Sequence, residues 1–503
     1  MSTTQSKTDK EPDTRRIRIV FTGLVLAMLM ASLDQTIVST ALPTIVGDLR
    51  EVDDMPWVVT SYVLASTICM PIYGKLSDLS GRRNVFLVSI SVFLLGSLLC
   101  GLAQSGTGLV VARTVQGIGG GGLFVLSQAI IADVVPPRER GRYMSFLGVV
   151  FGVASVAGPF LGGIVTDAAS WRWCFFVNLP IGALTIFFVT AFLKPGATGR
   201  AFKLDWAGTA LLALGSTGIV LVSSWGGTRY PWTSPVVLGL AAGVVVCAVL
   251  FVLAERRAAE PVIPPHLFRD PVFVLTSLVG LLVGAAMFSA ASYLPTFFQM
   301  ANGVNATESG LLMLPMVVAF VIVSTWTGKQ IARTGRYKVF PVAGTAVITL
   351  GFVLMSLMGS TTPLYLSAVY TAVVGVGMGL AMQVLVVAVQ NSVPQADLGT
   401  ATSAHTYFRE VGASLGVALV GAVFTGRLAA NLPAGLPGGT SVTPELVRGL
   451  PPELRAGVAQ SYADSLPQIF LYLAPALAVA VLLMACVKEK PMGGAPAPVE
   501  EQA

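Results

Sequence analysis

Four charged residues lie deep inside long apolar stretches, where a charge is costly. Asp34 follows an apolar run, Arg113 lies within another, and Arg409 and Glu410 form an adjacent pair inside a third. A charge at the centre of a lipid bilayer costs at least about 2.5 kcal/mol, so such residues are usually functional. A carboxylate in this position can take up protons or bind cations. These four side chains are the first candidates for proton coupling.

Other residues with chemical potential form no recognisable site. The five cysteines are far apart and fall inside or at the end of apolar runs, as small packing residues do. His266 and His405 are too distant in sequence for a metal-ligand motif, and no GxSxG, GxxxxGK[ST] or HExxH pattern occurs. We therefore expect no enzyme activity, metal site or cofactor. The spread of basic residues over short segments argues against nucleic-acid binding.

The composition indicates a membrane protein with many spans. Of the 503 residues, 54% are hydrophobic and 11% are charged, against about 25% charged in soluble domains. Such a chain cannot cover a water-facing surface. Stretches without Asp, Glu, Lys or Arg, together with the spans that hold the charges above, predict fourteen transmembrane helices of about 20 residues.

The basic residues predict the orientation of the spans. Most Lys and Arg residues outside the spans fall in the segments on one side of the membrane. This side includes the N-terminal segment, which carries Lys7, Lys10, Arg15, Arg16 and Arg18. Cytoplasmic segments carry this excess. Both termini are therefore expected inside the cell, with the first span acting as an uncleaved signal anchor in the cytoplasmic membrane.

The sequence contains an internal repeat. The matching pairs, 254 to 258 positions apart, are Gly74 with Gly328, Gly81 with Gly335, Val135-Pro136 with Val393-Pro394, Gly141 with Gly399 and Ser145 with Ser403. They place the first six helices opposite the last six and leave two helices as an inserted pair. Two parallel repeats are typical of transporters that work by alternating access, with the binding site between the halves.

The expected fold class is an all-α integral membrane protein, divided into five parts. These are a cytoplasmic tail (1–17), a six-helix bundle (18–193), an inserted helix pair (205–254), a second six-helix bundle (272–487) with an extracytoplasmic loop (429–467), and a cytoplasmic tail (488–503). Within the loop, a stretch of helical pattern near 452–465 is either an external gate or a connector.

Asp34 must be buried if the first span is to cross the bilayer. A helix that ended before it would hold only the 15 apolar residues from Ile19 to Leu33, which are too few. The helix is therefore expected to continue to about Pro43. Removal from water favours the protonated carboxyl, so a proton and a cationic substrate could compete for this group. The alternative is a structural carboxylate held by hydroxyl groups or by one Arg.

The other buried charges are assigned by their depth. Arg113 is predicted at a depth similar to that of Asp34, as its basic partner; the alternative is an Arg that extends to the outer interface. Arg409 and Glu410 are predicted near the midplane. Adjacent helical side chains diverge by about 100°, so we expect these two to face different partners. Glu410 is the second candidate proton or cation site, unless the pair is structural.

An aromatic pocket could bind flat lipophilic cations. The predicted lining residues are Tyr293, Phe297, Phe298, Gln299 and Tyr407. The alternative is that these side chains pack inside the protein or against lipid.

Five motifs follow one another along the chain. They are Leu33-Asp34-Gln35-Thr36-Ile37-Val38 with Ala41-Leu42-Pro43; Gly74-Lys75-Leu76-Ser77-Asp78-Leu79-Ser80-Gly81-Arg82-Arg83; Arg113-Thr114-Val115-Gln116-Gly117; Gly148 and Gly152 with Gly158-Pro159 and Gly162-Gly163; and Trp171-Arg172-Trp173 with Asn178 and Pro180. Together they resemble the fourteen-helix drug:proton antiporter family of the major facilitator superfamily, and the resemblance covers nearly the whole chain.

The resemblance implies a proton-driven exporter of lipophilic, cationic drugs or secondary metabolites. Its partners would be small lipophilic substrates, protons and the lipid bilayer, and it would work as a monomer in a bacterial cell membrane. The family pattern also implies a proton-transfer role for Arg113. A dedicated exporter of one metabolite, lipid or siderophore is the alternative within transport, and a membrane receptor with the same fold is the alternative outside it.

Two of the motifs are expected to switch conformation. Residues of the loop motif would form a cytoplasmic charge latch, and small residues of the fifth helix would allow close packing and a kink. The first set is Gly74, Asp78, Gly81, Arg82 and Arg83, and the second is Gly158, Pro159, Gly162 and Gly163. In the second half Ala332 stands opposite Asp78, so only the first copy is expected to work as a latch.

Overall fold

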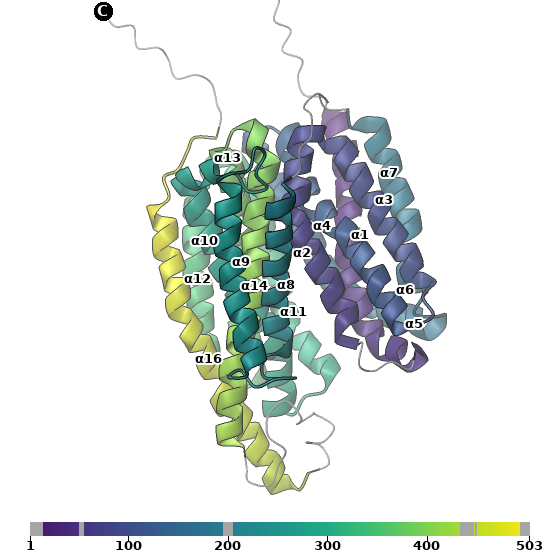
Figure 1. The fold of residues 1–503 in the computed structure, drawn as a ribbon. Helices are drawn as coiled ribbons and strands as arrows, with labels where there is room; N and C mark the ends of the chain where they lie inside the picture. Colours follow the sequence, from purple (N-terminus) through teal and green to yellow (C-terminus); the bar gives the residue numbers. More distant parts are fainter. Residues whose placement is uncertain (1–13, 50–54, 195–204, 433–446, 448–449, 493–503) are drawn as a thin grey trace, which may run out of the picture.

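The computed structural model is a bundle of long helices that run roughly side by side (Figure 1). It describes residues 14–49, 55–194, 205–432, 447 and 450–492. The ends of the two predicted tails, 1–13 and 493–503, and most of the middle of the predicted outer loop lie outside the described residues. The first helix begins at Thr14 and the last ends at Cys486, on the same side of the bundle. We call this side cytoplasmic, following the distribution of basic residues.

The first half of the chain contains six spans, of which the sixth is broken. They are α1 (Thr14–Leu49), α2 (Met55–Ser80), α3 (Arg82–Gly101), α4 (Gly106–Val134), α5 (Pro137–Ala168), and α6 (Trp173–Phe176) followed by α7 (Asn178–Phe192). The inserted pair is α8 (Trp206–Trp225) and α9 (Pro235–Glu255).

The second half repeats the arrangement after a short 3-10 helix, η1 (Pro265–Arg269). Its elements are α10 (Pro271–Ala301), α11 (Ala306–Thr334), α12 (Val339–Met355), α13 (Leu364–Ser392), η2 (Gln395–Asp397), α14 (Leu398–Asn431) and α16 (Pro452–Cys486). Among the described residues, 13 helices are long and apolar enough to cross a membrane, counting α6 and α7 as one, and α12 is a shorter apolar helix. The prediction of an all-α membrane protein with fourteen helices is confirmed.

The spans begin and turn where the sequence supplies suitable polar or glycine residues. Side chains of Ser105 and Asp270 accept hydrogen bonds from the first free backbone amides of α4 and α10, which stabilises these helix starts. Gly81 and Gly335, which the repeat pairs, both adopt a positive φ, 88° and 70°, where other residues would be strained. The repeated glycine therefore takes a positive φ in both halves, although Gly81 stands directly before α3 and Gly335 directly after α11.

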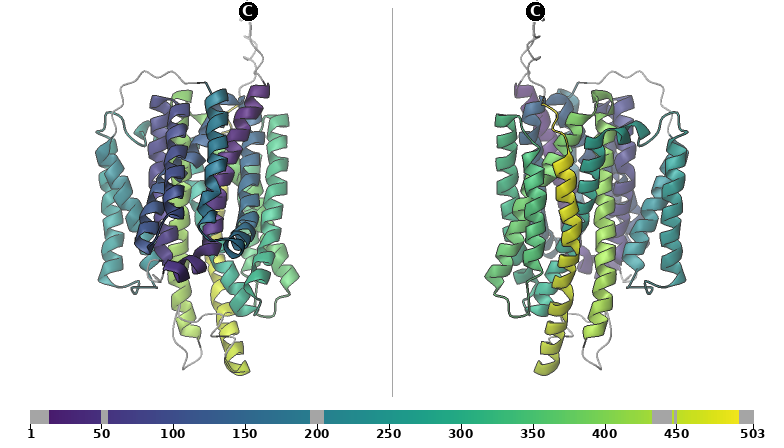
Figure 2. Two further views of the ribbon diagram at one scale, coloured as in Figure 1. Left: turned by 90° about the vertical axis from the view of Figure 1, so that its right-hand side faces the viewer. Right: turned by 90° about the vertical axis from the view of Figure 1, so that its left-hand side faces the viewer.

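The helices form two bundles that meet along two helix pairs. In the first, α1 packs against α5 and α7, and α4 packs between α2 and α3; in the second, α10 packs against α14 and α16, and α13 packs against α11 and α12. The bundles meet where α2 lies along α14 and where α5 lies along α11. Figure 2 shows the bundle from its two sides. The inserted α8 packs on α9 and also contacts α14 and α2.

The outer end of the second bundle differs from the prediction. Helix α14 continues to Asn431, and the final helix is continuous from Pro452 to Cys486, although the sequence suggested a loop over 429–467. Ser461 donates a hydrogen bond to the carbonyl of Asn431 and Asn431 donates one to Ser465, so the two helix ends are held together. The stretch predicted near 452–465 is thus the first part of the last helix.

Candidate functional site

The carboxylate of Asp34 is fully enclosed by protein. Its exposed fraction is 0%, and α1 continues well beyond it, past Pro43, as the length of the span required. Arg113 Nη1 donates a hydrogen bond to Oδ2 at 2.6 Å, Gln116 Nε2 donates to Oδ1 at 2.7 Å, and Asn178 Nδ2 donates to Oδ1 at 2.9 Å. Helices α1, α4 and α7 thus converge on one carboxylate.

Arg113 is held as firmly as the acid that it pairs with. Its exposed fraction is 1%, which shows that it does not extend to the outer interface. Its Nε donates to the carbonyl of Val58 at 3.1 Å, its Nη1 also donates to Gln116 Oε1 at 2.8 Å, and its guanidinium lies 4.3 Å from the ring centroid of Tyr62. A buried ion pair is stable only when such extra hydrogen bonds satisfy the remaining polar atoms.

Asn178, which the sequence offered only as part of a motif and without a role in the site, is also a member of it. It stands at the start of α7, where the sixth span is interrupted, and it also donates to Ser97 on α3 at 2.9 Å. An amide inside an apolar segment, next to a helix break, is the signal that could have identified it. Gln116, which the sequence named within a motif, joins α4 to α1 by its hydrogen bond to Asp34.

Thr36, half a turn after Asp34 on α1, connects the site to α5. Thr36 Oγ1 donates to the carbonyl of Ala154 at 3.1 Å. A Cβ at Gly158 would overlap the side chain of Thr36, and one at Gly162 would approach the backbone of Ile37 closely. These two glycines therefore allow the close packing that was predicted, and Pro159 lies within the same helix.

Gly163 differs from the other residues of this set. A Cβ at Gly163 would have nothing within 4 Å, so this glycine does not serve the contact between α1 and α5.

At the cytoplasmic end, Asp78 caps a helix of the opposite half. Its carboxylate accepts hydrogen bonds from the backbone amides of Gly399 and Thr400 at 3.0 and 2.7 Å and from the Thr400 hydroxyl at 2.8 Å. Arg82 pairs with Asp78 at 3.2 Å and also forms an ion pair with Asp133 at the end of α4. A carboxylate at the N-terminus of a helix is favourable because it meets unpaired amides and the positive end of the helix dipole.

Arg83 had been expected to join this latch, but it does not. Its Nη2 donates to the carbonyl of Thr190 at the cytoplasmic end of α7, because successive side chains of α3 diverge by about 100° and Arg82 and Arg83 therefore face different sides.

The repeated glycines contact the other half reciprocally. A Cβ at Gly74 on α2 would overlap Ser403 and the Gly399 carbonyl on α14. Its repeat partner, Gly328 on α11, stands in the same relation to Ser145 and the Gly141 carbonyl on α5. Two close helix contacts therefore hold the halves together on the cytoplasmic side. We call these two contacts, together with the bonds of Asp78, the cytoplasmic gate.

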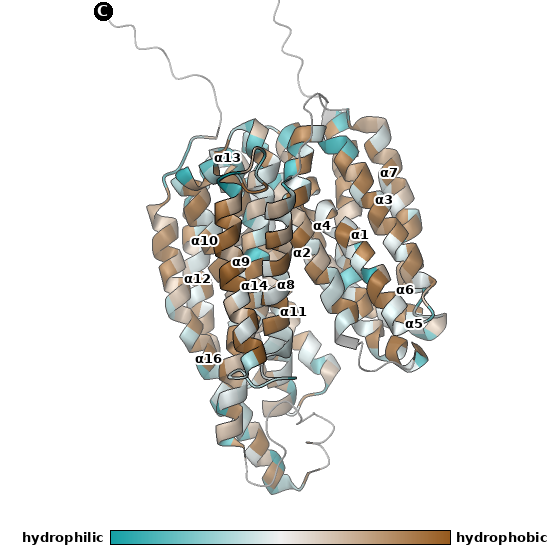
Figure 3. Cartoon of the chain, viewed as in Figure 1, coloured by the Kyte–Doolittle hydropathy of each residue, from teal (hydrophilic) through white to brown (hydrophobic). Residues whose placement is uncertain are grey.

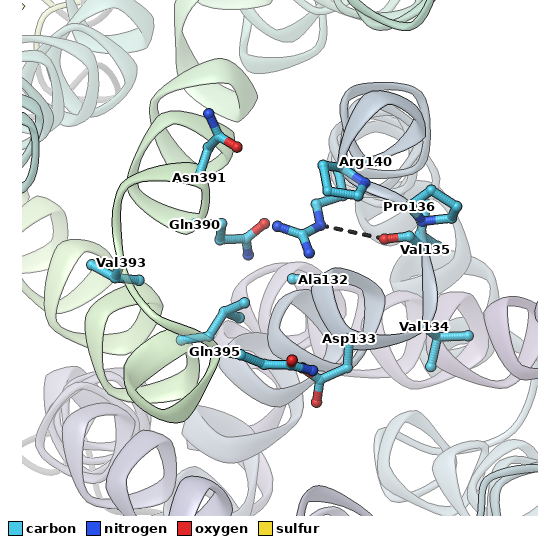
Figure 4. A pocket seen from close by; sticks show the side chains of 12 residues that line it. Ala132, Asp133, Val134, Val135, Pro136, Arg140, Gln390, Asn391, Val393 and Gln395 are labelled. Carbon is cyan, nitrogen blue, oxygen red and sulfur yellow. Dashed lines mark hydrogen bonds between the residues drawn. The ribbon is translucent and has the colours of Figure 1, made fainter. Parts of the chain in front are cut away.

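A polar cavity of about 580 Å³ lies at this end of the molecule (Figure 4). It is bounded by the turn between α4 and α5 and by the turn between α13 and α14, which carry the repeated Val-Pro motif. Arg140 extends between these walls, with its Nε donating to the Val135 carbonyl, and Gln390 approaches from α13 (Figure 4). The sequence did not predict these lining residues.

Arg409 and Glu410 pair with one another rather than with different partners. Arg409 Nη2 lies 2.9 Å from Glu410 Oε1, and the guanidinium lies 5.6 Å from the ring centroid of Phe124 on α4. The expectation from helix geometry was wrong because both side chains are long enough to bend back across the 100° between their Cβ directions. The pair is mostly buried, with 10% and 18% of the side chains exposed.

The aromatic residues predicted to line one pocket are not gathered around one. Phe297 and Phe298 are fully buried in the core of the second bundle, because α10 packs between α14 and α16. Tyr293 donates to the Val417 carbonyl, and the Tyr407 hydroxyl lies 2.9 Å from that of Ser216 on α8.

Gln299 is half-buried on the same helix, α10. Within the described ranges, no three His, Cys, Asp or Glu side chains could hold a metal ion.

Comparison with known proteins agrees with this architecture. The family model "Major Facilitator Superfamily" matches residues 24–417. An MFS-type transporter of Mycobacterium tuberculosis is 44% identical over 484 residues, which cover 95% of this chain and 70% of that protein. The multidrug transporter protein MdtP of Bacillus subtilis is 36% identical over 421 residues, covering 84% and 78%. An efflux pump of Aspergillus niger is 34% identical over 505 residues, covering 96% and 89%.

A solved structure shows the same fold at low sequence identity. The human organic anion transporter MFSD10 aligns with a TM-score of 0.63 and 14% identity, covering 93% of this chain and 99% of that one. With the family match and the relatives above, this agrees with the resemblance to the fourteen-helix branch. The chain belongs to the major facilitator superfamily, a family of multi-pass membrane transporters that are not enzymes, and its relatives include multidrug transporters and efflux pumps.

Proposed function

We propose that the protein exports lipophilic, cationic drugs or secondary metabolites in exchange for protons, as a monomer in the cytoplasmic membrane of a bacterium. The observation that carries the proposal is the fully buried pair of Asp34 and Arg113. A purely structural contact would gain little from such a pair, since apolar residues of similar volume often stabilise a protein more. The need for a carboxylate that can change its protonation state is a reason to retain the buried pair.

A proton on Asp34 would change the balance of this site. Arg113 would then keep its charge without a counter-charge in a fully buried position, which is costly. The helices that meet there must rearrange to relieve this cost. Helix α1, which carries the acid, is the element displaced in the proposed mechanism.

Movement of α1 would reach the gate through α5. Thr36, half a turn from Asp34, donates to the carbonyl of Ala154 on α5 and packs on Gly158. The cytoplasmic part of the same helix holds Gly141 and Ser145 against α11. One helix therefore contacts both the proton site and the gate, so a proton at one end can change the stability of the contact at the other.

We infer the step of the cycle from the conformation of the gate. The halves are joined at the cytoplasmic side by Asp78 with α14 and by the two reciprocal glycine contacts. We therefore infer a state closed to the cytoplasm, in which substrate leaves and protons enter from outside. When the gate opens, the cavity beside Arg140 would become part of the cytoplasmic entrance.

In the proposed mechanism, the partner of a substrate cation is Glu410. This acid is paired with Arg409, which lies beside Phe124 on the opposite half. An aromatic face and a carboxylate are the groups that bind a lipophilic cation. A substrate that displaced Arg409 would contact both halves at once, as alternating access requires.

The test is export of a panel of dyes from vesicles with and without an imposed proton gradient. We expect several cationic dyes to be exported, faster when the outside is acidic. Export of one compound only would favour a dedicated exporter, and the absence of any flux would favour a receptor. Export that ignores the gradient would contradict proton coupling.

A further inference from the structure

A cavity of about 520 Å³ lies outside the transport bundle, between the inserted helix pair and α14. Its walls are almost entirely apolar and include Leu212 and Ile219 from α8, Phe251 and Val252 from α9, and Phe408 and Val411 from α14. Figure 3, coloured by hydropathy, shows that α8 and α9 consist mostly of hydrophobic residues. The cavity is separate from the Asp34 site and the cytoplasmic gate.

The cavity extends along one leaflet of the bilayer. On α9 and the residue that follows it, the lining runs from Val244 to Arg256, twelve residue steps or about 18 Å of helix. One leaflet has a hydrocarbon layer of about 15 Å, half of the usual 30 Å. Only 6% of the apolar window of α9 is buried, so this helix faces lipid. The C-terminal turns of α9, which line the cavity, lie in the cytoplasmic leaflet.

The polar end of the cavity carries an unpaired cation. Arg256 lines it, is exposed, and forms no ion pair with any of the residues that the structure describes. The neighbouring acid, Glu255, is buried and accepts hydrogen bonds from the amides of Val262 and Ile263 at 3.2 and 3.1 Å. Glu255 therefore fixes the connector after α9, and the charge offered to a ligand is positive.

We propose that this cavity binds an anionic phospholipid of the cytoplasmic leaflet, with an acyl chain between α8, α9 and α14 and the phosphate at Arg256. The apolar length matches a chain, and the cation lies where the headgroups of an anionic leaflet begin. A lipophilic cation fits less well, because Glu255, the one carboxylate among the lining residues, already accepts two backbone hydrogen bonds and Arg256 would repel a cation.

The bound lipid would complete the attachment of the inserted pair. Among the described side chains, the direct hydrogen bond between α8 and α14 is that of Ser216 with Tyr407. An acyl chain would fill the space on the cytoplasmic side of this bond. The proposal does not depend on which substrate is exported or on its coupling to protons.

The test uses the full-length protein in nanodiscs with a trace of phosphatidylglycerol that carries a diazirine near the end of one acyl chain. Peptides of α8, α9 and α14 are expected to be labelled more than with the matching phosphatidylcholine probe. Arg256→Gln should remove this preference, about 5-fold, since one arginine near the surface is worth about 1 kcal/mol. Arg257→Gln, on the same connector but outside the cavity lining, is the matched control.

A second pair of variants tests occupancy of the cavity itself. Ala248→Trp fills the cavity and should reduce labelling, whereas Val249→Trp adds the same ring to the exposed face of α9, away from the cavity, and should not. Native mass spectrometry of the unmodified protein should show one retained phosphatidylglycerol. Equal labelling by both lipid probes, equal effects of the two Trp variants, or displacement of the lipid by a cationic dye would overturn the proposal.

Discussion

Lys75 Nζ lies 2.8 Å from Glu260 Oε2, and this ion pair joins the gate helix α2 to the connector that follows the inserted pair. The inserted pair is therefore fixed at two places, to α2 by this contact and to α14 by the bond between Ser216 and Tyr407. In the proposed mechanism, helices α2 and α14 separate when the gate opens. The inserted pair would then bridge two elements that move relative to one another.

Breaking this bridge should alter the rate of gate opening. Lys75→Glu and Glu260→Lys should each change the transport rate a few-fold, since a partly buried pair contributes about 1 kcal/mol or less. The double variant with both changes restores opposite charges and should recover most of the activity. Initial rates of dye export from vesicles give the measurement. A double variant as impaired as either single variant would show that the residues act separately.

Asp34→Asn should abolish export driven by a proton gradient while leaving membrane insertion intact. The amide keeps the size of the side chain but cannot exchange a proton. Proteoliposomes with an imposed pH gradient provide the measurement. Asp48→Asn is the control on the same helix, since Asp48 pairs with Arg172 at a half-exposed position. Equal losses in the two variants would remove the special role of Asp34.

Arg113→Ala should reduce transport more than substrate binding. The guanidinium bonds Asp34, Gln116 and the Val58 carbonyl, so its loss leaves a buried carboxylate without its cation. Arg113→Lys retains the charge but not the several donors of the guanidinium. Its transport rate should lie between those of the wild type and of Arg113→Ala. Binding by dye fluorescence and transport by vesicle flux are compared in the same preparation. Parallel losses in both would count against coupling.

Asn178→Ala should weaken proton-driven export about 10-fold or more without abolishing it. The variant removes one of three hydrogen bonds to Asp34, and a bond to a charged group contributes about 1.5 kcal/mol or more. The pH profile of transport should also change, which a defect in packing alone would not produce. Thr185→Ala, another buried polar residue of α7, serves as the comparison. An unchanged pH profile would make Asn178 structural.

Gly74→Val should hold the cytoplasmic gate open, because the added side chain overlaps Ser403 and the Gly399 carbonyl. Distances between spin labels on α2 and α14 should lengthen at the cytoplasmic end. Gly163→Val is the control in another helix, at a glycine with free space around it. If both variants gave the closed distance, close packing at Gly74 would not determine gate closure.

The sequence predicted those parts of the fold that follow from the cost of charge in a membrane. Spans are visible as charge-free stretches, and the enclosure of Asp34 follows from the minimum length of the first span. The repeat paired Gly74 with Gly328, and the structure shows that each meets the fifth helix of the opposite half. These features depend on periodicity and length, which the sequence records directly.

The features that were missed depend on the direction and reach of individual side chains. Arg409 bends back to Glu410, and Phe297 faces the core instead of a pocket. Neither outcome follows from the spacing of residues along a helix. Asn178 joins Asp34 only because the break between α6 and α7 places it there, and such a contact over 144 positions is set by tertiary packing.

The length of the last helix has a mechanical consequence. Helix α16 has 35 residues, about 52 Å, so it extends well beyond a hydrocarbon layer of about 30 Å, and its outer end is bonded to that of α14. A small tilt of the second bundle would therefore be magnified at this projecting hairpin. A fluorophore placed there would act as a pointer that reports each half-cycle from outside the cell, without a probe in the transport path.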